Sequence, residues 1–114
     1  MDRIKIARTL LKLAKQLISG QIKGDNVDTV IRSIRKEIKA FTQVSLPVVT
    51  GSRVRDGKAL FIGYPSRDDA SEANRYLNKL VANYKGRIAI KVGAVVMGRS
   101  RKAPFEFLVT VKEE

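Results

Sequence analysis

The chain has 114 residues, and 23 lysine and arginine side chains against 11 acidic ones give it a formal net charge of +12. This length fits one compact domain, and this charge favours a polyanionic partner: nucleic acid, an acidic membrane surface or an acidic protein. The chain has no cysteine and no histidine, which excludes disulfides, Cys/His zinc sites and Ser-His-Asp or Cys-His catalysis.

The positive charge is spread along the chain. Residues 1–45 hold ten basic and four acidic side chains, residues 46–86 seven and four, and residues 87–114 six and three. A basic tail on a neutral domain has a different distribution, so we expect the folded body to carry positive surface. No apolar run approaches the roughly 18 residues of a membrane span, and charges interrupt the N-terminal apolar residues, so we expect a cytoplasmic protein.

Residues 4–18 predict a cationic amphipathic helix, which ends at Ser19 and Gly20. Apolar side chains recur on one face of it, and lysine and arginine side chains recur on the other. The wide apolar face favours packing against a second helix or a second subunit, and the lack of Trp and Phe disfavours a membrane surface. The candidate self-association residues on this face are Leu10, Leu13 and Leu17.

The segment from Ile4 to Lys15 resembles the basic Ala/Leu/Lys helices that open many uncharacterised phage-encoded proteins. This resemblance implies a small viral accessory or virion protein, which would be virion-associated rather than cytoplasmic. It assigns no functional residue.

A second helix is predicted from a cap at Asp25 or Asn26 to Phe41. Its apolar face consists of Val27, Val30, Ile31, Ile34, Ile38 and Phe41. The short linker between the two predicted helices favours an antiparallel helical hairpin over residues 1–45.

Residues 48–55 and 58–64 then predict two strands of a β-hairpin. Asp56-Gly57 between them is a signal for a two-residue type I′ turn, which needs positive φ at both positions. That turn would place Arg53 and Arg55 on one face of the first strand, with Lys58 opposite Arg55. Strand aromatics usually fill the core, and Tyr64, next to Pro65, is the one that we most expect to be exposed.

A third helix follows from Ser66, which has capping-box spacing to Asp69, and it closes at Lys85-Gly86. Two more strands are predicted, from Arg87 to Met97 and from Phe105 to Lys112. The loop that joins them carries three cations: Arg99, Arg101 and Lys102.

The predicted fold is a single α+β domain over residues 1–114, with a helical hairpin (1–45) followed by a ββαββ unit (46–114). We expect a four-stranded antiparallel or mixed sheet with the helices on one face. If the third helix is a crossover, the third strand runs parallel to the second, and the two basic tips lie at opposite ends of the sheet. One monomer would then not easily clamp a ligand between the tips, whereas a dimer could bring them together.

Catalytic and nucleotide-binding signatures are missing from the sequence. It contains neither of two glycine-rich phosphate-binding motifs, Gly-x-Gly-x-x-Gly and Gly-x4-Gly-Lys-Ser/Thr. Asp68, Asp69 and Glu72 fall at the start of the third helix, where acidic side chains complement the helix dipole, so they do not predict a magnesium site. We therefore expect no enzyme activity, no cofactor and no metal.

The leading hypothesis is a non-enzymatic protein that contacts the phosphates of DNA or RNA, largely without reading sequence, because arginine forks fit phosphate oxygens. The candidate contacts are Arg53, Arg55, Lys58, Lys91, Arg99, Arg101 and Lys102. Edge-strand protection and solubility are the other explanation of these cations. The alternative function is a structural or adaptor protein that self-associates or docks an acidic protein through its N-terminal helix. A homodimer fits either hypothesis.

Overall fold

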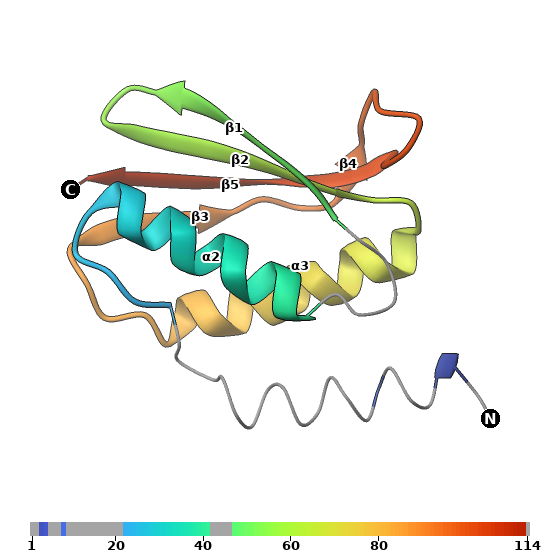
Figure 1. Ribbon diagram of the computed structural model, residues 1–114, viewed down its shortest axis with the longest axis horizontal. Helices are drawn as coiled ribbons and strands as arrows, with labels where there is room; N and C mark the ends of the chain where they lie inside the picture. The colour runs from blue at the N-terminus through green and yellow to red at the C-terminus, as the bar shows by residue number, and fades with distance from the viewer. Residues whose placement is uncertain (1–2, 5–7, 9–21, 42–46, 114) are drawn as a thin grey trace.

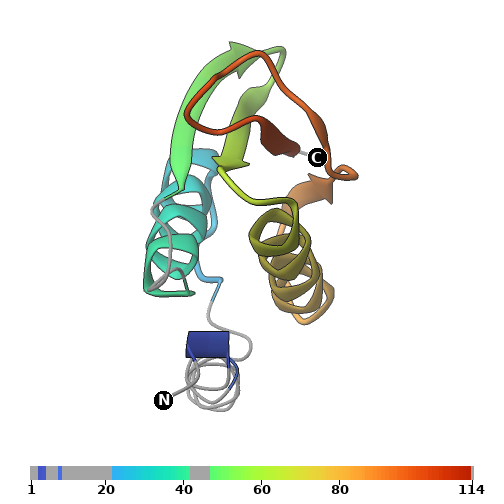
Figure 2. The same ribbon diagram turned by 90° about the vertical axis from the view of Figure 1, so that its right-hand side faces the viewer.

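The computed structural model describes residues 3–4, 8, 22–41 and 47–113. Within these residues, five strands form one antiparallel sheet, and two helices lie on the same side of it (Figures 1 and 2). The elements are α2 (Val27–Phe41), β1 (Val48–Val54), β2 (Gly57–Tyr64), α3 (Arg67–Ala82), β3 (Ile88–Val92), β4 (Val96–Met97) and β5 (Phe105–Glu113). The predicted α+β class is confirmed. The first predicted helix falls mostly outside the described residues, so the helical hairpin remains a prediction.

The helix α2 begins where the sequence placed a cap. The side chain of Asn26 accepts a hydrogen bond from the backbone N–H of Thr29 at 2.9 Å, which satisfies one of the free donors of the first turn. The predicted apolar face of α2 points inward, and its fully or almost fully buried members are Val30, Ile31, Ile34 and Ile38.

The helix α3 also follows its sequence signals. The hydroxyl of Ser66 accepts a hydrogen bond from the N–H of Asp69 at 3.5 Å, and Asp68 and Asp69 occupy the first turn. Ala70, Ala73, Tyr76, Leu77 and Leu80 are buried on the face that packs toward the sheet.

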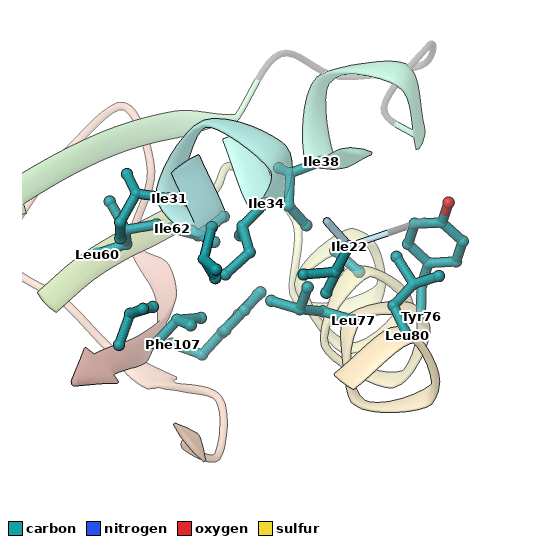
Figure 3. Packing of buried hydrophobic residues seen from close by; sticks show 14 of the residues in the cluster. Ile22, Ile31, Ile34, Ile38, Leu60, Ile62, Tyr76, Leu77, Leu80 and Phe107 are labelled. Atoms are coloured by element: carbon teal, nitrogen blue, oxygen red, sulfur yellow. The ribbon is translucent and has the colours of Figure 1, made fainter. Parts of the chain in front are cut away.

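The hydrophobic core lies between these two helices and the two central strands (Figure 3). The sheet contributes Leu60 and Ile62 from β2, and Phe107, Val109 and Val111 from β5, all fully buried. Side chains alternate between the faces of a strand, so these residues define the face of the sheet that the helices cover.

The strand order is β1-β2-β5-β3, with β4 also paired to β5. The strands β2 and β3 are both antiparallel to β5, so they run in the same direction. Gly57 pairs with Lys112 at one end of β2, and Tyr64 pairs with Phe105 at the other. The β1–β2 turn and the loop before β5 therefore lie at opposite ends of the sheet, as the sequence predicted.

The β1–β2 turn differs from the prediction by one residue. Val54 pairs with Gly57 and Arg53 pairs with Lys58, so the two loop residues are Arg55 and Asp56. Only Asp56 has a positive φ, of 62°, so the expected type I′ turn at Asp56-Gly57 is wrong.

The physical reason is that Gly57 already belongs to β2 and lies directly against β5. A Cβ atom on Gly57 would collide with the carbonyl oxygen of Val111 and lie 2.8 Å from the Cα of Lys112. Glycine is needed here for the close approach of two strands, not for the dihedral angle of the turn.

The predicted strand from Arg87 to Met97 is divided by a bulge, which gives five strands instead of four. Val92 pairs with Val109 and Val96 pairs with Glu106, so three residues of one strand face two of the other. The side-chain amide of Asn74 in α3 donates a hydrogen bond to the carbonyl of Gly93 in this bulge at 2.7 Å. The extra residue turns Val96 to the opposite face of the sheet from Val92.

One buried polar pair joins the two helices. The hydroxyl of Tyr76 in α3 donates a hydrogen bond to a carboxylate oxygen of Glu37 in α2 at 3.3 Å, and the ring of Tyr76 stacks on Phe41. Burial raises the pKa of the Glu37 carboxyl, although the hydrogen bond and the charge of Lys36 lower it in part. Burial and the charge of Glu37 raise the pKa of the Tyr76 hydroxyl.

We predict that Gly57→Ala lowers the free energy of unfolding by about 1–3 kcal/mol, the usual cost of forcing atoms into a packed position. Gly51→Ala is the matched control on β1, because the nearest atoms to its new Cβ lie at an ordinary 3.5 Å. The control should change stability by less than about 0.5 kcal/mol. Urea unfolding of both variants measures the difference, and equal effects would contradict the close approach of β2 and β5.

We predict that Glu37→Gln gains stability relative to the native protein as the pH rises. The folded state raises the pKa of Glu37, so native stability falls as the carboxyl ionises above its ordinary value of 4.5 and levels off above the raised pKa. Glutamine does not ionise and escapes this loss. Melting temperatures from pH 4 to pH 8 test the prediction, and a difference between the two proteins that does not change with pH contradicts it.

Candidate nucleic-acid interface

The face of the sheet away from α2 and α3, which we call the outer face, carries the second set of side chains of each strand. On β5 these alternate with the buried Phe107, Val109 and Val111. The outer-face residues of β5 are Glu106, Leu108, Thr110 and Lys112. Within the described residues, no helix covers this face (Figure 2).

Apolar side chains are exposed at the middle of the outer face. Phe61 of β2 and Leu108 of β5 are direct partners across the two central strands, and they are 37% and 38% exposed. Val48 and Val96 lie on the same face, paired with Gly63 and Glu106, and are also exposed. The outer face therefore holds four of the six exposed large hydrophobic side chains in the described part of the chain.

Two lysines of the strands share this face. Lys91 of β3 pairs with Thr110, which places it on the outer face beside β5, and it is exposed. Lys112 lies two residues beyond Thr110 on β5 and is exposed as well. Both lie toward the end of the sheet that carries the β1–β2 turn.

The loop of residues 98–104 carries three further cations at the other end. Its base is closed by a hydrogen bond from the N–H of Gly98 to the carbonyl of Pro104 at 2.6 Å. Ala103 is buried against Gly63, because the Cβ of Ala103 lies 2.9 Å from the position a Cβ on Gly63 would take. The loop rises from the sheet on the side away from the helices (Figures 1 and 2). This anchoring leaves Arg99, Arg101 and Lys102 exposed.

The negative charge on the outer face is small. Its one described carboxylate in the strands is Glu106, which is half-buried with its carboxyl group against Gly98 at the base of the loop. The cations form no ion pair with a carboxylate among residues 22–41 and 47–113. These cations are Lys91, Arg99, Arg101, Lys102 and Lys112. Five positive charges therefore face one negative charge on this side of the sheet.

The basic tip predicted at the β1–β2 turn is arranged differently. Arg53 pairs with Lys58 on the helix-facing side of the sheet, so the expected pairing of Lys58 with Arg55 is wrong. The ammonium group of Lys58 lies 3.1 Å from a carboxylate oxygen of Asp28 in the first turn of α2. Arg55 sits in the turn itself, is almost fully exposed and lies 4.0 Å from the carboxylate of its neighbour Asp56.

The structure thus separates the seven predicted contacts. Lys91 and the three loop cations lie on the outer side of the sheet, and Arg55 lies at the turn that borders it. Arg53 and Lys58 lie on the helix-facing side. The self-association candidates Leu10, Leu13 and Leu17 lie outside the described residues.

Sequence reasoning misplaced the exposed aromatic residue. Tyr64 is fully buried, because it shares the helix-facing side of β2 with Leu60 and Ile62, so the expectation of its exposure is wrong. Phe61 is the exposed ring. Lys112 and Leu108 were not singled out either, although the alternation along residues 105–112 places them together on one face.

Other kinds of site find little support in the described residues. They contain no group of three or more acidic side chains placed to hold a metal ion. None of the helices described is long and apolar enough to cross a membrane. Comparisons of the chain with protein-family models, curated proteins and solved structures find no match.

Proposed function

We propose that this is a non-enzymatic protein that binds the phosphate backbone of nucleic acid, largely independently of sequence. The observation that carries the proposal is the outer face, which holds five cations without carboxylate partners in the described residues and a single glutamate. A polyanion gains affinity from such a surface by releasing its condensed counterions.

The chemistry of the cations favours phosphates over base edges. Arg99 and Arg101 are exposed on a loop, and their planar guanidinium groups match phosphate oxygens with two parallel hydrogen bonds. Lys91 and Lys112 add point charges on flexible stems, which do not require a fixed partner geometry. Contacts of this kind position a nucleic acid without reading its sequence.

The spacing of the basic groups favours an extended ligand. The strand β2 has eight residues, which corresponds to about 25 Å between the β1–β2 turn and the 98–104 loop. Figure 1 shows the turn and the loop at opposite ends of the sheet. A compact anion cannot touch Arg55 and Arg101 together, whereas a polyanion that lies along the strands contacts both ends.

A structural or adaptor role is the second candidate function. In this role the protein self-associates or docks an acidic protein, through Leu10, Leu13 and Leu17 of the N-terminal segment. One observation supports this role: the outer face exposes apolar side chains that a second copy of the chain could cover. These side chains are Val48, Phe61, Val96 and Leu108. Under this alternative a phage-like virion or accessory protein is the proposed context.

We predict that replacing Arg99, Arg101 and Lys102 together by glutamine weakens nucleic-acid binding by about tenfold or more at low salt. The slope of log K against log salt should fall in magnitude by about 2–3, because each of the three lost phosphate contacts contributes roughly 0.7–0.9. Fluorescence anisotropy with a labelled oligonucleotide at several salt concentrations measures both quantities.

The matched control is the triple substitution of Arg67, Arg75 and Lys79 by glutamine. These three residues are exposed on α3, on the other side of the sheet, and the change in net charge is the same. The control should keep its affinity within about twofold if the outer face makes the contacts. An equal loss of affinity in both triple variants would mean that binding depends on net charge and not on the outer face. If the native protein does not bind at low salt, the proposed function is wrong.

A further inference from the structure

We infer that the nucleic acid bound by the outer face is single-stranded, and that the ring of Phe61, beside Leu108, stacks on one of its bases. This inference rests on the proposed function and specifies the kind of strand that it requires. Single-strand binding surfaces combine cations that follow the backbone with aromatic rings that stack on bases.

The surroundings of Phe61 leave its ring accessible. Its neighbours on the outer face of β2 are Ala59 and Gly63, which are two residues away on either side and small. Across the strands it pairs with Thr50 on β1 and Leu108 on β5. Phe61 is therefore the one large side chain on the outer face of β2, and it is 37% exposed in the middle of the sheet.

The cations lie where the backbone of a stacked nucleotide would pass. The strand β5 separates β2 from β3, and Lys91 is level with Ala59, so Lys91 lies two strand spacings from Phe61, about 10 Å across the sheet, and two residues along it. The flexible side chain of Lys91 lets its ammonium group reach toward the backbone phosphate of a nucleotide whose base stacks on Phe61. The 98–104 loop flanks the ring on the other side, since Ala103 of the loop packs on Gly63, the next outer-face residue of β2.

A duplex fits this surface less well. Its bases are stacked on one another, so a protein contacts their edges in the grooves, and a side chain reaches a base face only by unstacking a step, at a cost in stacking free energy. A ring on the face of a sheet stacks without this cost on an unpaired base whose flat surface is free. An apolar protein partner would meet Phe61 and Leu108 within a border of five cations, and this charge complements phosphates.

The test compares probes that share phosphates and differ in bases. Labelled oligouridylate and oligothymidylate of about 12 nucleotides, within the site sizes of other single-strand binders, are the base-bearing probes. An abasic deoxyribose-phosphate strand of equal length and a duplex complete the set. The native protein should bind a base-bearing strand about tenfold tighter than the abasic strand, the order expected for one base stack. Comparison of the affinities for oligouridylate and oligothymidylate shows whether the protein prefers single-stranded RNA or single-stranded DNA.

The Phe61→Leu variant should lose most of this preference and keep its affinity for the abasic strand. Leucine keeps apolar bulk on the strand and removes the ring. Phe61→Tyr keeps the ring and should keep the preference. Thermal melting checks that both variants fold, and the comparison of probes on the native protein decides the question if one does not.

Two results would overturn the inference and leave phosphate binding intact: equal affinity of the native protein for base-bearing and abasic strands, or tighter binding to the duplex. Absence of binding to every probe at low salt would overturn both the inference and the proposed function. A self-associated protein that Phe61→Leu converts to a monomer would assign the outer face to a second copy, and would also overturn the inference.

Discussion

The antiparallel pairing of β2 with β5 determines which side chains of the sheet enter the core and which face outward. Leu60 pairs with Val109 and Ile62 with Phe107, so all four side chains enter the core under α2 and α3. The same register places Phe61 opposite Leu108 on the outer face. Because side chains alternate, a slip of one residue in β2 would bury Phe61, and a slip of one residue in β5 would bury Leu108. Either slip would expose part of the core. Gly57 supports this register by letting the backbones of the two strands meet closely.

Two irregular features of the chain, a bulge and a loop, shape the outer face of the sheet. The bulge at residues 93–95, held by Asn74 of α3, reverses the facing of the chain between Val92 and Val96. The loop that follows is held to the sheet by Ala103 on Gly63, with its cations left in solvent. The proposed binding surface thus depends on small residues, which permit close packing, as much as on the cations themselves.

The sequence predicted those parts of the fold that local patterns determine. The apolar period of α2 identified that helix and its buried face, the Ser66 cap identified the start of α3, and residues 105–112 were predicted as a strand. The prediction failed where a contact distant in sequence decides the outcome. Gly57 looked like a turn glycine because its approach to Val111 is invisible locally, and the bulge depends on a side chain 19 residues away. The continuous apolar run of β2 hid which of Phe61 and Tyr64 faces outward, because only the pairing with β5 fixes that choice. The sequence pattern identified the three cations of the 98–104 loop, but Lys112 was not among the predicted contacts. No local feature of the sequence indicated that Lys58 forms an ion pair with Asp28.

A map of backbone amide chemical shifts would show whether the outer face of the sheet is the binding surface. The labelled protein would be titrated with an unlabelled oligothymidylate at low salt. If the outer face binds the strand, we expect the largest shifts on residues 59–63, 98–104 and 106–112 and at Lys91, with α3 little changed. Shifts concentrated on α2, on α3 or on residues 1–21, with the outer face unaffected, would contradict this expectation.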